Sequence, residues 1–350
     1  MKNKKKFKRL LIILLLLLLL LLSVTILSAQ SEETNDHPVY LPLIASGSFD
    51  DVTEGEDYVI IEGDIQVSRE FYEQLVNSQL GAASTYLPTQ ASLWPNGIVP
   101  FEFAATVTTA NRTLMLAAMA DWEATANIDF RPRNGEVAHV LIQNSSANNS
   151  PVGWANEQRV INILNWNYHF IMMHELAHTL GYWHEQSRSD RNNFVIIRWE
   201  HIIDEEEHNF ALKTDAGRYG TYDFDSLMHY GACDFVLPTL TCPDDYTIQV
   251  REPYSDTWQQ TIGQRDHLSR LDGLTMSFLY PEQNWRFVDS NYTGSGVGTF
   301  LQPVRSLALG VTNTPSNGVL WIQPGDYSAI GVYNKPLTLQ APLGGVMLGN

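Results

Sequence analysis

Residues 174–191, which read H-E-L-A-H-T-L-G-Y-W-H-E-Q-S-R-S-D-R, combine residue types and spacings that could bind a metal ion. On a helix, His174 and His178 are four residues apart and therefore project from the same face. Gly181 permits the positive φ that ends a helix and turns the chain, which would bring His184 back as a third imidazole. Three neutral imidazoles leave the fourth position of a tetrahedral zinc ion open for water, so the spacing predicts a catalytic zinc site.

Glu175 follows the first histidine and can lean toward a water bound to the same metal ion. An alternative interpretation is an ordinary core helix with two buried histidines and an ion-paired glutamate, because Leu176, Ala177 and Leu180 supply an apolar stripe. The pattern continues through the third histidine, however, and four positions would then have to coincide by accident. We therefore favour the zinc site, with Glu175 as the general base.

The extended string resembles the signature of the astacin zinc endopeptidases, which are metzincins. Further resemblance lies in S-L-M-H-Y at 226–230, in S-L-W-P-N-G-I-V-P-F at 92–101 and in I-G-Q-R at 262–265. In the family the first of these further motifs is a methionine turn beneath the zinc, and its tyrosine, here Tyr230, reaches the metal as a fifth ligand. The resemblance also implies that Tyr230 donates a hydrogen bond to the oxyanion during catalysis and that Glu185 helps to receive the new N-terminus of the mature enzyme.

This resemblance implies an α+β fold: a metzincin catalytic domain over 90–282, with a twisted, mostly parallel sheet, long helices and a zinc cleft between two subdomains. Within it we expect strands at 98–103, 137–142 and 160–164 and helices at 109–126 and 194–212. The strand at 137–142 would line the cleft and pair antiparallel with an extended substrate, as in the family.

The N-terminus reads as a targeting segment. Six basic residues lie among the first nine, and an unbroken apolar run covers residues 10–22. The small residues Ser28 and Ala29 follow, as at a signal-peptide cleavage site. Residues 1–29 are therefore predicted to be a secretory signal peptide, or else an uncleaved membrane anchor with the catalytic domain outside the cytoplasm. Under either interpretation the protein acts outside the cytoplasm, and only this segment would touch a membrane.

Residues 30–89 are predicted to be a propeptide or linker. Ile61-Glu62-Gly63-Asp64-Ile65 is similar to the propeptide motif that keeps astacin zymogens latent, in which the aspartate occupies the open zinc position. By this resemblance Asp64 is a metal ligand in the latent form only, and an activating protease would cleave between Ser84 and Trp94. A disordered spacer is the alternative for this acidic stretch.

Charge excludes one class of partner. Without the first 29 residues, 16 of the 22 basic residues remain against 39 acidic ones, a formal charge of −23. Such a surface repels polyanions, so we expect no nucleic-acid partner and take protein or peptide substrates as the ligands.

The chain has two cysteines, Cys233 and Cys242, and lacks those of the two disulfides usual in the resembled family. In an oxidising compartment these two would pair into a local loop, with two free thiols as the alternative. Beyond Pro281 the composition shifts to short strand and turn signals. Residues 283–350 resemble the opening coil of secreted right-handed parallel β-helices, with a capping helix at 303–309. This β-helix-like segment is either a small all-β appendage or the beginning of a longer array.

The sequence therefore predicts a secreted zinc endopeptidase, made as a zymogen, with one Zn²⁺ per chain. The competing hypothesis is an extracellular binding or adhesion protein built on an inactive protease scaffold. A scaffold under no catalytic demand could lose the catalytic carboxylate, and Glu175 is present.

Overall fold

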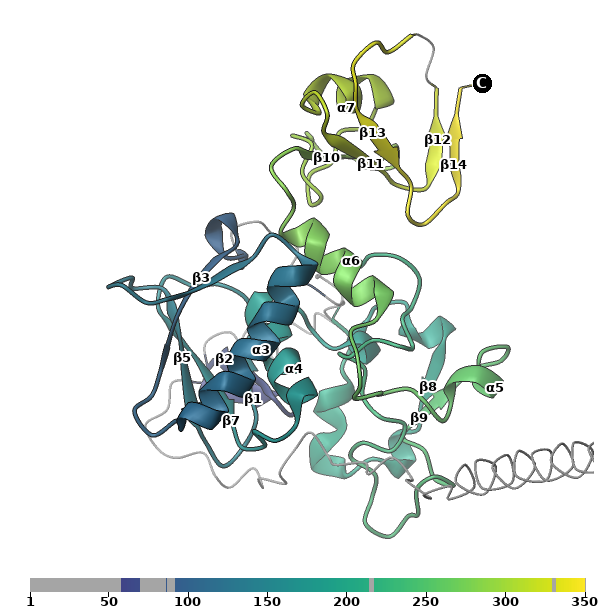
Figure 1. The fold of residues 1–350 in the computed structure, drawn as a ribbon. Helices are drawn as coiled ribbons and strands as arrows, with labels where there is room; N and C mark the ends of the chain where they lie inside the picture. The colour runs from purple at the N-terminus through teal and green to yellow at the C-terminus, as the bar shows by residue number, and fades with distance from the viewer. Residues whose placement is uncertain (1–57, 70–85, 87–91, 214–216, 329–331, 350) are drawn as a thin grey trace, which may run out of the picture. The chain divides into compact units, whose positions relative to one another are not determined.

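The computed structural model describes residues 58–69, 86, 92–213, 217–328 and 332–349, all within one compact unit, 42–350 (Figure 1). The predicted signal peptide or anchor lies outside the described residues, as does most of the predicted propeptide. Among the helices that are described, none is both long and apolar enough to cross a membrane.

A four-stranded parallel sheet supports the N-terminal half of the predicted catalytic domain. Its order is β4 (Asp129–Pro132), β3 (Ile98–Phe103), β5 (His139–Asn144) and β7 (Gln158–Ile163). Buried residues recur along β3, β5 and β7, as expected where strands pack on a core. The predicted parallel sheet is therefore confirmed.

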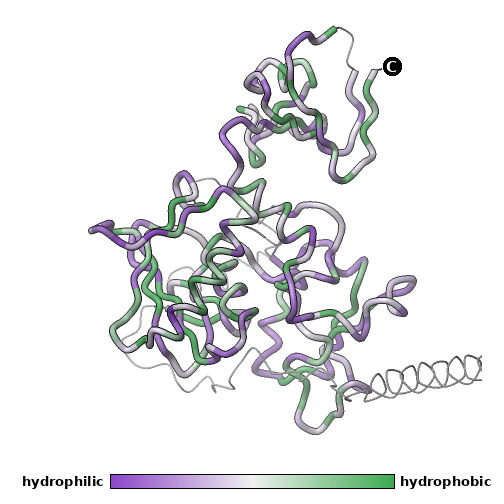
Figure 2. The backbone as a smooth tube through the Cα atoms, viewed as in Figure 1, coloured by the Kyte–Doolittle hydropathy of each residue, from purple (hydrophilic) through white to green (hydrophobic). Residues whose placement is uncertain are grey.

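Two helices pack together beside this sheet (Figure 1): α3 (Thr109–Thr125) and α4 (His169–Leu180). The hydroxyl of Thr108 caps α3 by accepting a hydrogen bond from the backbone N–H of Asn111. Trp122 of α3 is fully buried, and its indole N–H donates to the carbonyl oxygen of Met173 at 3.0 Å. This bond ties α3 to α4 one residue before the first predicted zinc ligand. Figure 2 shows apolar stretches along the strands and along α4.

The predicted strand at the cleft edge is wrong. The strand at 137–142 is observed as β5, which lies inside the sheet between β3 and β7. The edge strand on this side of the sheet is β7, and β6 (Ser150–Pro151) lies beside it, where an isolated antiparallel bridge joins Asn149 to Asn162. A two-residue strand gives no alternating pattern, so the sequence carried no signal for it.

The predicted propeptide motif forms a hairpin of β1 (Tyr58–Ile61) and β2 (Ile65–Ser68), and β2 pairs parallel with β6. Ile61, Ile65 and Val67 form a small apolar cluster with Trp183. The described part of residues 30–89 therefore contains ordered secondary structure, and the disordered-spacer alternative is wrong there.

The predicted helix at 194–212 is also wrong. Strand β8 (Val195–Ile197) pairs antiparallel with β9 (Ile248–Val250), and two 3-10 helices follow, η5 (Trp199–His201) and η6 (Asp204–Phe210). Three β-branched residues in succession favour a strand. Their partner strand lies some fifty residues later in the chain, which a local pattern cannot reveal.

The core of the predicted catalytic domain consists of two apolar clusters. The larger includes the sheet, α3, α4 and α6 (Arg270–Leu279), and the smaller includes β8, β9, Phe210 and Tyr230. The remaining short elements are η2 (Pro95–Gly97), η3 (Glu185–Ser187), η4 (Arg191–Asn193) and α5 (Ser255–Trp258). Cys233 and Cys242 are joined in a disulfide, which confirms their predicted pairing.

The C-terminal segment stacks short parallel strands. β10 (Trp285–Val288), β11 (Val319–Ile322) and β13 (Thr338–Gln340) form one sheet, and β12 (Gly325–Tyr327) pairs with β14 (Val346–Leu348). Helix α7 (Leu307–Asn313) begins four residues later than predicted because Ser306 caps it. The resemblance to a β-helix stays a prediction.

Candidate active site

Three imidazoles meet at the C-terminal part of α4. The Nε2 atom of His174 lies 3.1 Å from that of His178 and 3.2 Å from that of His184. Gly181 has φ +118° at the end of the helix, as the sequence predicted, and this left-handed turn returns the chain so that His184 faces the helix. With a carboxylate oxygen of Asp64, these nitrogens form a group within 4.8 Å of one another that could hold a metal ion.

The other ring nitrogen of each histidine is hydrogen-bonded to a fixed acceptor. Nδ1 of His174 donates to the carbonyl oxygen of Leu227 at 3.1 Å, and Nδ1 of His178 to that of Tyr182 at 2.8 Å. Nδ1 of His184 donates to a carboxylate oxygen of Glu62 at 3.0 Å. In the tautomer with its proton on Nδ1, the ring has a free lone pair on Nε2, and this lone pair can bind a metal ion. The donor set therefore fits zinc.

Burial keeps the imidazoles of His174 and His178 neutral. It lowers the pKa of His174 to about 3, against the opposing effect of Asp64, and it also lowers the pKa of His178. For Glu175, which is fully buried, burial first and then the negative charge of Asp64 raise the pKa well above its ordinary value. Among the described residues, neither oxygen of the Glu175 carboxylate has a hydrogen-bond partner. A carboxyl group in such surroundings is suited to taking up a proton.

Asp64 is positioned where a ligand from outside the three histidines would lie. Its carboxylate oxygens are 3.1 Å from His174, 3.3 Å from His184 and 3.5 Å from His178. Burial alone would raise its pKa, but the close contacts with the three imidazoles, with the attraction of His184 as the largest lowering effect, hold the pKa of Asp64 well below its ordinary value. The carboxylate is therefore ionised, as a metal ligand must be.

Tyr230 points toward the same place. Its ring centroid is 4.7 Å from that of His184, and its hydroxyl donates to the backbone carbonyl oxygen of Glu62 at 2.5 Å. Burial and then the charge of Asp64 raise the pKa of the Tyr230 phenol well above its ordinary value, so the phenol keeps its proton. A protonated phenol here can donate a hydrogen bond to a carbonyl oxygen.

The predicted methionine turn lies below the histidines and is held by Asp272 of α6. The Asp272 carboxylate accepts hydrogen bonds from the Ser226 hydroxyl at 2.7 Å and from the Leu227 N–H at 2.8 Å. Since the Leu227 carbonyl accepts from His174, this carboxylate orients a histidine through one intermediate residue. Met228 is buried.

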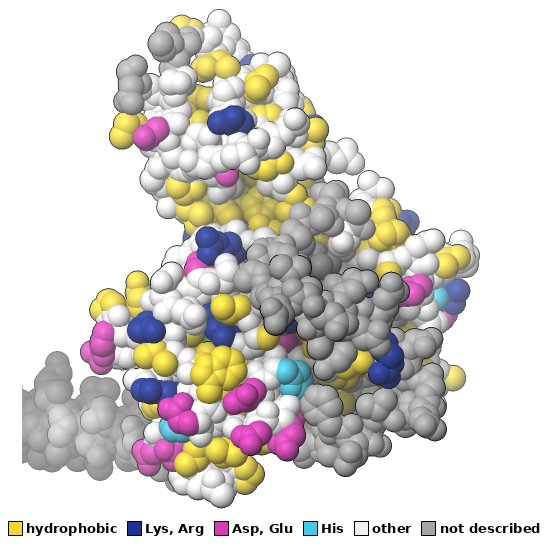
Figure 3. Space-filling model, turned by 180° about the vertical axis from the view of Figure 1, so that it is seen from behind, with side chains coloured by type: hydrophobic (Ala, Val, Ile, Leu, Met, Phe, Trp, Pro, Cys, Tyr) yellow, Lys and Arg dark blue, Asp and Glu magenta, His cyan; other side chains and the backbone are white. Residues whose placement is uncertain are grey.

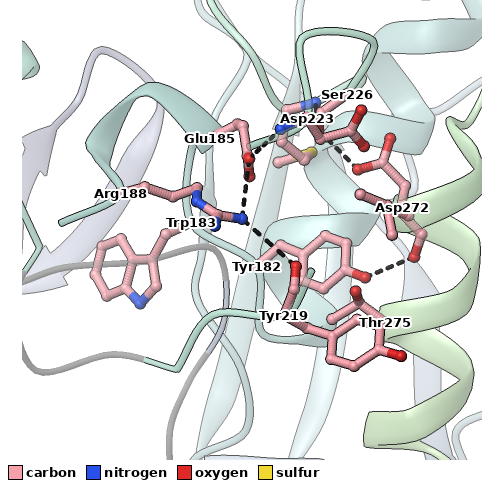
Figure 4. A pocket seen from close by; sticks show the side chains of 11 residues that line it. Tyr182, Trp183, Glu185, Arg188, Tyr219, Asp223, Ser226, Asp272 and Thr275 are labelled. Carbon is pink, nitrogen blue, oxygen red and sulfur yellow. Dashed lines mark hydrogen bonds and ion pairs between the residues drawn. The ribbon is translucent and has the colours of Figure 1, made fainter. Parts of the chain in front are cut away.

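A cavity of about 20 Å³, lined by both polar and apolar side chains, lies beside this turn and has room for about one water molecule. Figure 4 shows Arg188 and Glu185 pointing toward each other at its wall, with Tyr182 and Asp272 opposite. The Arg188 guanidinium lies 3.2 Å from Glu185 and 2.9 Å from Asp190. Burial raises the pKa of Glu185 well above its ordinary value, although Arg188 opposes the shift.

Comparison with known proteins agrees with this geometry. The model of the peptidase family described as Astacin matches residues 87–281, more than half of the chain. The chain belongs to the astacin family. Members of this family are zinc-dependent peptidases, so the astacin resemblance and its zinc cofactor are confirmed.

Individual astacin relatives match over different lengths. Flavastacin of Elizabethkingia meningoseptica is 28% identical over 268 residues, covering 72% of this chain and 58% of its own. Low choriolytic enzyme of Oryzias latipes is 32% identical, over 53% of this chain and 68% of its own. Meprin A subunit beta of Homo sapiens is also 32% identical, over 69% of this chain and 32% of its own. The chain thus spans less than two thirds of flavastacin and of the meprin subunit. A solved structure of high choriolytic enzyme 1, a hatching enzyme zinc-protease from Oryzias latipes, superposes with a TM-score of 0.49 at 28% identity, over 55% of this chain and 96% of its own.

Hydrogen bonds join Asn127 and Trp166 to other segments of the chain. Asn127 donates from its backbone to the carbonyl of Tyr280 at 3.0 Å and from its side chain to that of Pro281 at 3.2 Å. The Trp166 indole N–H donates to the side-chain oxygen of Asn144 at 2.9 Å.

The structure places all six predicted site residues in one buried group. Sequence reasoning missed Glu62, Lys213 and the role of Asp272. Glu62 lies in the propeptide motif at residues 61–65, but the sequence predicted a role only for Asp64 of that motif. Lys213 had no local signal, since it meets Glu62 only through the fold.

Proposed function

We propose that this protein is a secreted zinc endopeptidase, made as a zymogen, in which Glu175 is the general base. The observation that carries the proposal is the convergence of three imidazole Nε2 atoms beside the fully buried carboxylate of Glu175. His174, His178 and His184 would hold the zinc ion, which supplies a bound water with a pKa near 7 and polarises the scissile carbonyl.

Glu175 takes a proton from the attacking water and delivers it to the departing amine nitrogen. Its raised pKa favours uptake of the proton, and its burial excludes bulk water from that transfer. The Tyr230 hydroxyl donates to the carbonyl oxygen of the scissile bond. The bond from Tyr230 to the Glu62 carbonyl, in the segment beside the histidines, supports this role. One such donor is typically worth about 3 kcal/mol in the transition state.

Latency follows from the position of Asp64. Its carboxylate lies against all three imidazoles, where it would occupy the position of the catalytic water. Strand β2 pairs with β6 at the edge that an extended substrate would use. The hairpin would therefore block both the metal position and the substrate position. An activating protease cleaving between Ser84 and Trp94 would release it. Glu185 would then take part in receiving the new N-terminus, as the family resemblance implies.

Protein or peptide substrates fit the charge of the surface. On the face drawn in Figure 3, acidic side chains gather over the lower part of the molecule, in keeping with the formal charge of the whole chain, −17. Such a surface disfavours nucleic acid. The signal peptide or anchor at residues 1–29 stays a prediction.

The test compares three proteins loaded with zinc and processed at the predicted junction: the unchanged sequence, Glu175→Ala, and the control Glu157→Ala, whose side chain is 65% exposed. Glu175→Ala should lower kcat for peptide cleavage by at least about 10²-fold while about one zinc ion per chain remains bound. Glu157→Ala should match the unchanged enzyme. Activity in Glu175→Ala equal to that of the control, or activity that survives a zinc chelator, would refute the mechanism.

A second measurement addresses latency in the unprocessed chain. Asp64→Ala should expose the site and give peptide cleavage without processing. If unprocessed Asp64→Ala stays as inactive as the unchanged chain, the zymogen proposal fails.

A further inference from the structure

The turn between β1 and β2 brings a second carboxylate to the predicted catalytic domain, beside the one at the histidines. We infer that Lys213, Ser187 and His184 form a carboxylate-binding site, separate from the metal position, and that its occupant is Glu62 of the predicted propeptide. This inference rests on the proposed latency and adds a second attachment point to it.

Three donors from the catalytic domain surround the Glu62 carboxylate. The Lys213 ammonium contacts one oxygen, and the other accepts hydrogen bonds from the Ser187 hydroxyl at 3.1 Å and from Nδ1 of His184 at 3.0 Å. Glu62, Ser187 and His184 are fully buried, and Lys213 is 6% exposed. An ionised carboxylate buried this deeply is stable only when paired and hydrogen-bonded, which these contacts provide.

The site is built from the catalytic domain alone. The backbone N–H of Lys213 donates to the carbonyl oxygen of Ser187 at 2.8 Å, which fixes the two donors relative to each other. The Lys213 ammonium also lies 4.9 Å from the ring centroid of Trp183, a cation–π contact. The partners in both contacts belong to the predicted catalytic domain.

The backbone of Glu62 indicates that its side chain is needed. Glu62 has φ +50° and Gly63 has φ +78°, so both residues of the turn are left-handed. Glycine, asparagine or aspartate would adopt this conformation at lower cost than glutamate. The contacts of the carboxylate, together with the hydrogen bond from Tyr230 to the Glu62 carbonyl, offset that cost.

Two-point attachment has a consequence for the metal site. Nδ1 of His184 donates to the Glu62 carboxylate, which orients the ring so that Nε2 faces the other histidines. Asp64 would block the metal while Glu62 orients one of its ligands. Release of the hairpin therefore requires both carboxylates to leave their sites.

The experiment measures hydrogen exchange at the backbone amides of residues 61–65 in the full-length, zinc-loaded chain. Every protein carries Glu175→Ala, so self-cleavage does not intervene. Glu62→Gln and Lys213→Met should each speed exchange about 10–100-fold, the range for losing a buried charge-assisted pair. The double variant should exchange well below the product of the two effects, because both changes remove one interaction. Arg69→Gln, at an exposed position just after β2, is the control and should leave exchange unchanged.

Exchange in Glu62→Gln within twofold of the starting protein would overturn the inference, as would independent effects in the double variant. Exchange in α4 reports whether Lys213→Met disturbs the catalytic domain. If Lys213→Met speeds exchange in α4, the result for Glu62→Gln alone tests the inference, since the Glu62 side chain belongs to the hairpin. Asp64→Asn separates this inference from the proposed latency. If only Asp64→Asn speeds exchange, the second site is wrong and the latency proposal stands. If only Glu62→Gln does, the carboxylate site stands and latency through Asp64 fails.

Discussion

Replacing Arg188 with glutamine should destabilise the region that supports the active site. The Arg188 guanidinium is 1% exposed and lies between Glu185, at 3.2 Å, and Asp190, at 2.9 Å. It also donates to the backbone carbonyl oxygens of Gly220 at 3.1 Å and Thr221 at 3.3 Å. Glutamine keeps part of the side-chain length and one N–H donor group. It removes the positive charge and the several N–H donors of the guanidinium group.

The magnitude depends mainly on Glu185. Its side chain is 3% exposed, whereas that of Asp190 is 20% exposed and can be solvated after the substitution. Removing one partner of a buried ion pair costs about 3–5 kcal/mol, because the remaining charge is left buried. Without Arg188, burial would raise the pKa of Glu185 further and the carboxyl would take up a proton. The double variant Arg188→Gln/Glu185→Gln should therefore recover about 1–3 kcal/mol of the loss.

The assay is equilibrium unfolding in urea followed by tryptophan fluorescence, at one zinc concentration for all variants. The matched control is Arg198→Gln, since Arg198 is 40% exposed and lies 3.9 Å from Glu200. That change should alter the free energy of unfolding by no more than about 0.5 kcal/mol. A cost below about 1 kcal/mol for Arg188→Gln, or no recovery in the double variant, would contradict the reasoning.

Three further predictions concern the turn beneath the metal site and the loop beside it. Burial first, and then a neighbouring aspartate, raise the pKa of Asp272 to about 7, so the folded state binds this proton more tightly than the unfolded state. Stability contributed by Asp272 should therefore fall as pH rises from about 4 to 7, by up to about 4 kcal/mol. Urea titrations across this range should show a smaller fall for Asp272→Asn, and an equal fall would contradict the assignment. Gly263→Ala should cost about 2 kcal/mol or more in the same assay and reduce peptide cleavage, because Gly263 has φ +74° and an added Cβ would lie 2.4 Å from the Gly231 backbone. An unchanged free energy of unfolding in Gly263→Ala would contradict this prediction, because it would mean that the Gly231 backbone can move to accommodate the added Cβ. Replacing Cys233 and Cys242 together with serine should cost about 2–3 kcal/mol, as expected for a loop this short, and the unchanged protein under reducing conditions should match it. Thermal unfolding that does not respond to reduction would argue against a stabilising role.

The sequence alone determined the chemistry of the site. Residues 174–184 carry three histidines, the glutamate and the helix-ending Gly181 within eleven positions, and helical geometry with one turn is enough to bring them together. Strands β3 and β7 and helix α3 were also readable, because their apolar periodicity is local.

Only the tertiary structure decided which segments surround that site. Strand β8 was mistaken for helix because its partner β9 is far away in the sequence, and β6 was missed because two residues make no pattern. The pairing of Glu62 with Lys213 joins residues 151 positions apart. Both are common surface residue types, and a buried ion pair between them depends on the packing of the hairpin against β6 and Trp183. Local residue patterns specify the metal ligands, whereas long-range packing determines which other side chains orient and cover them.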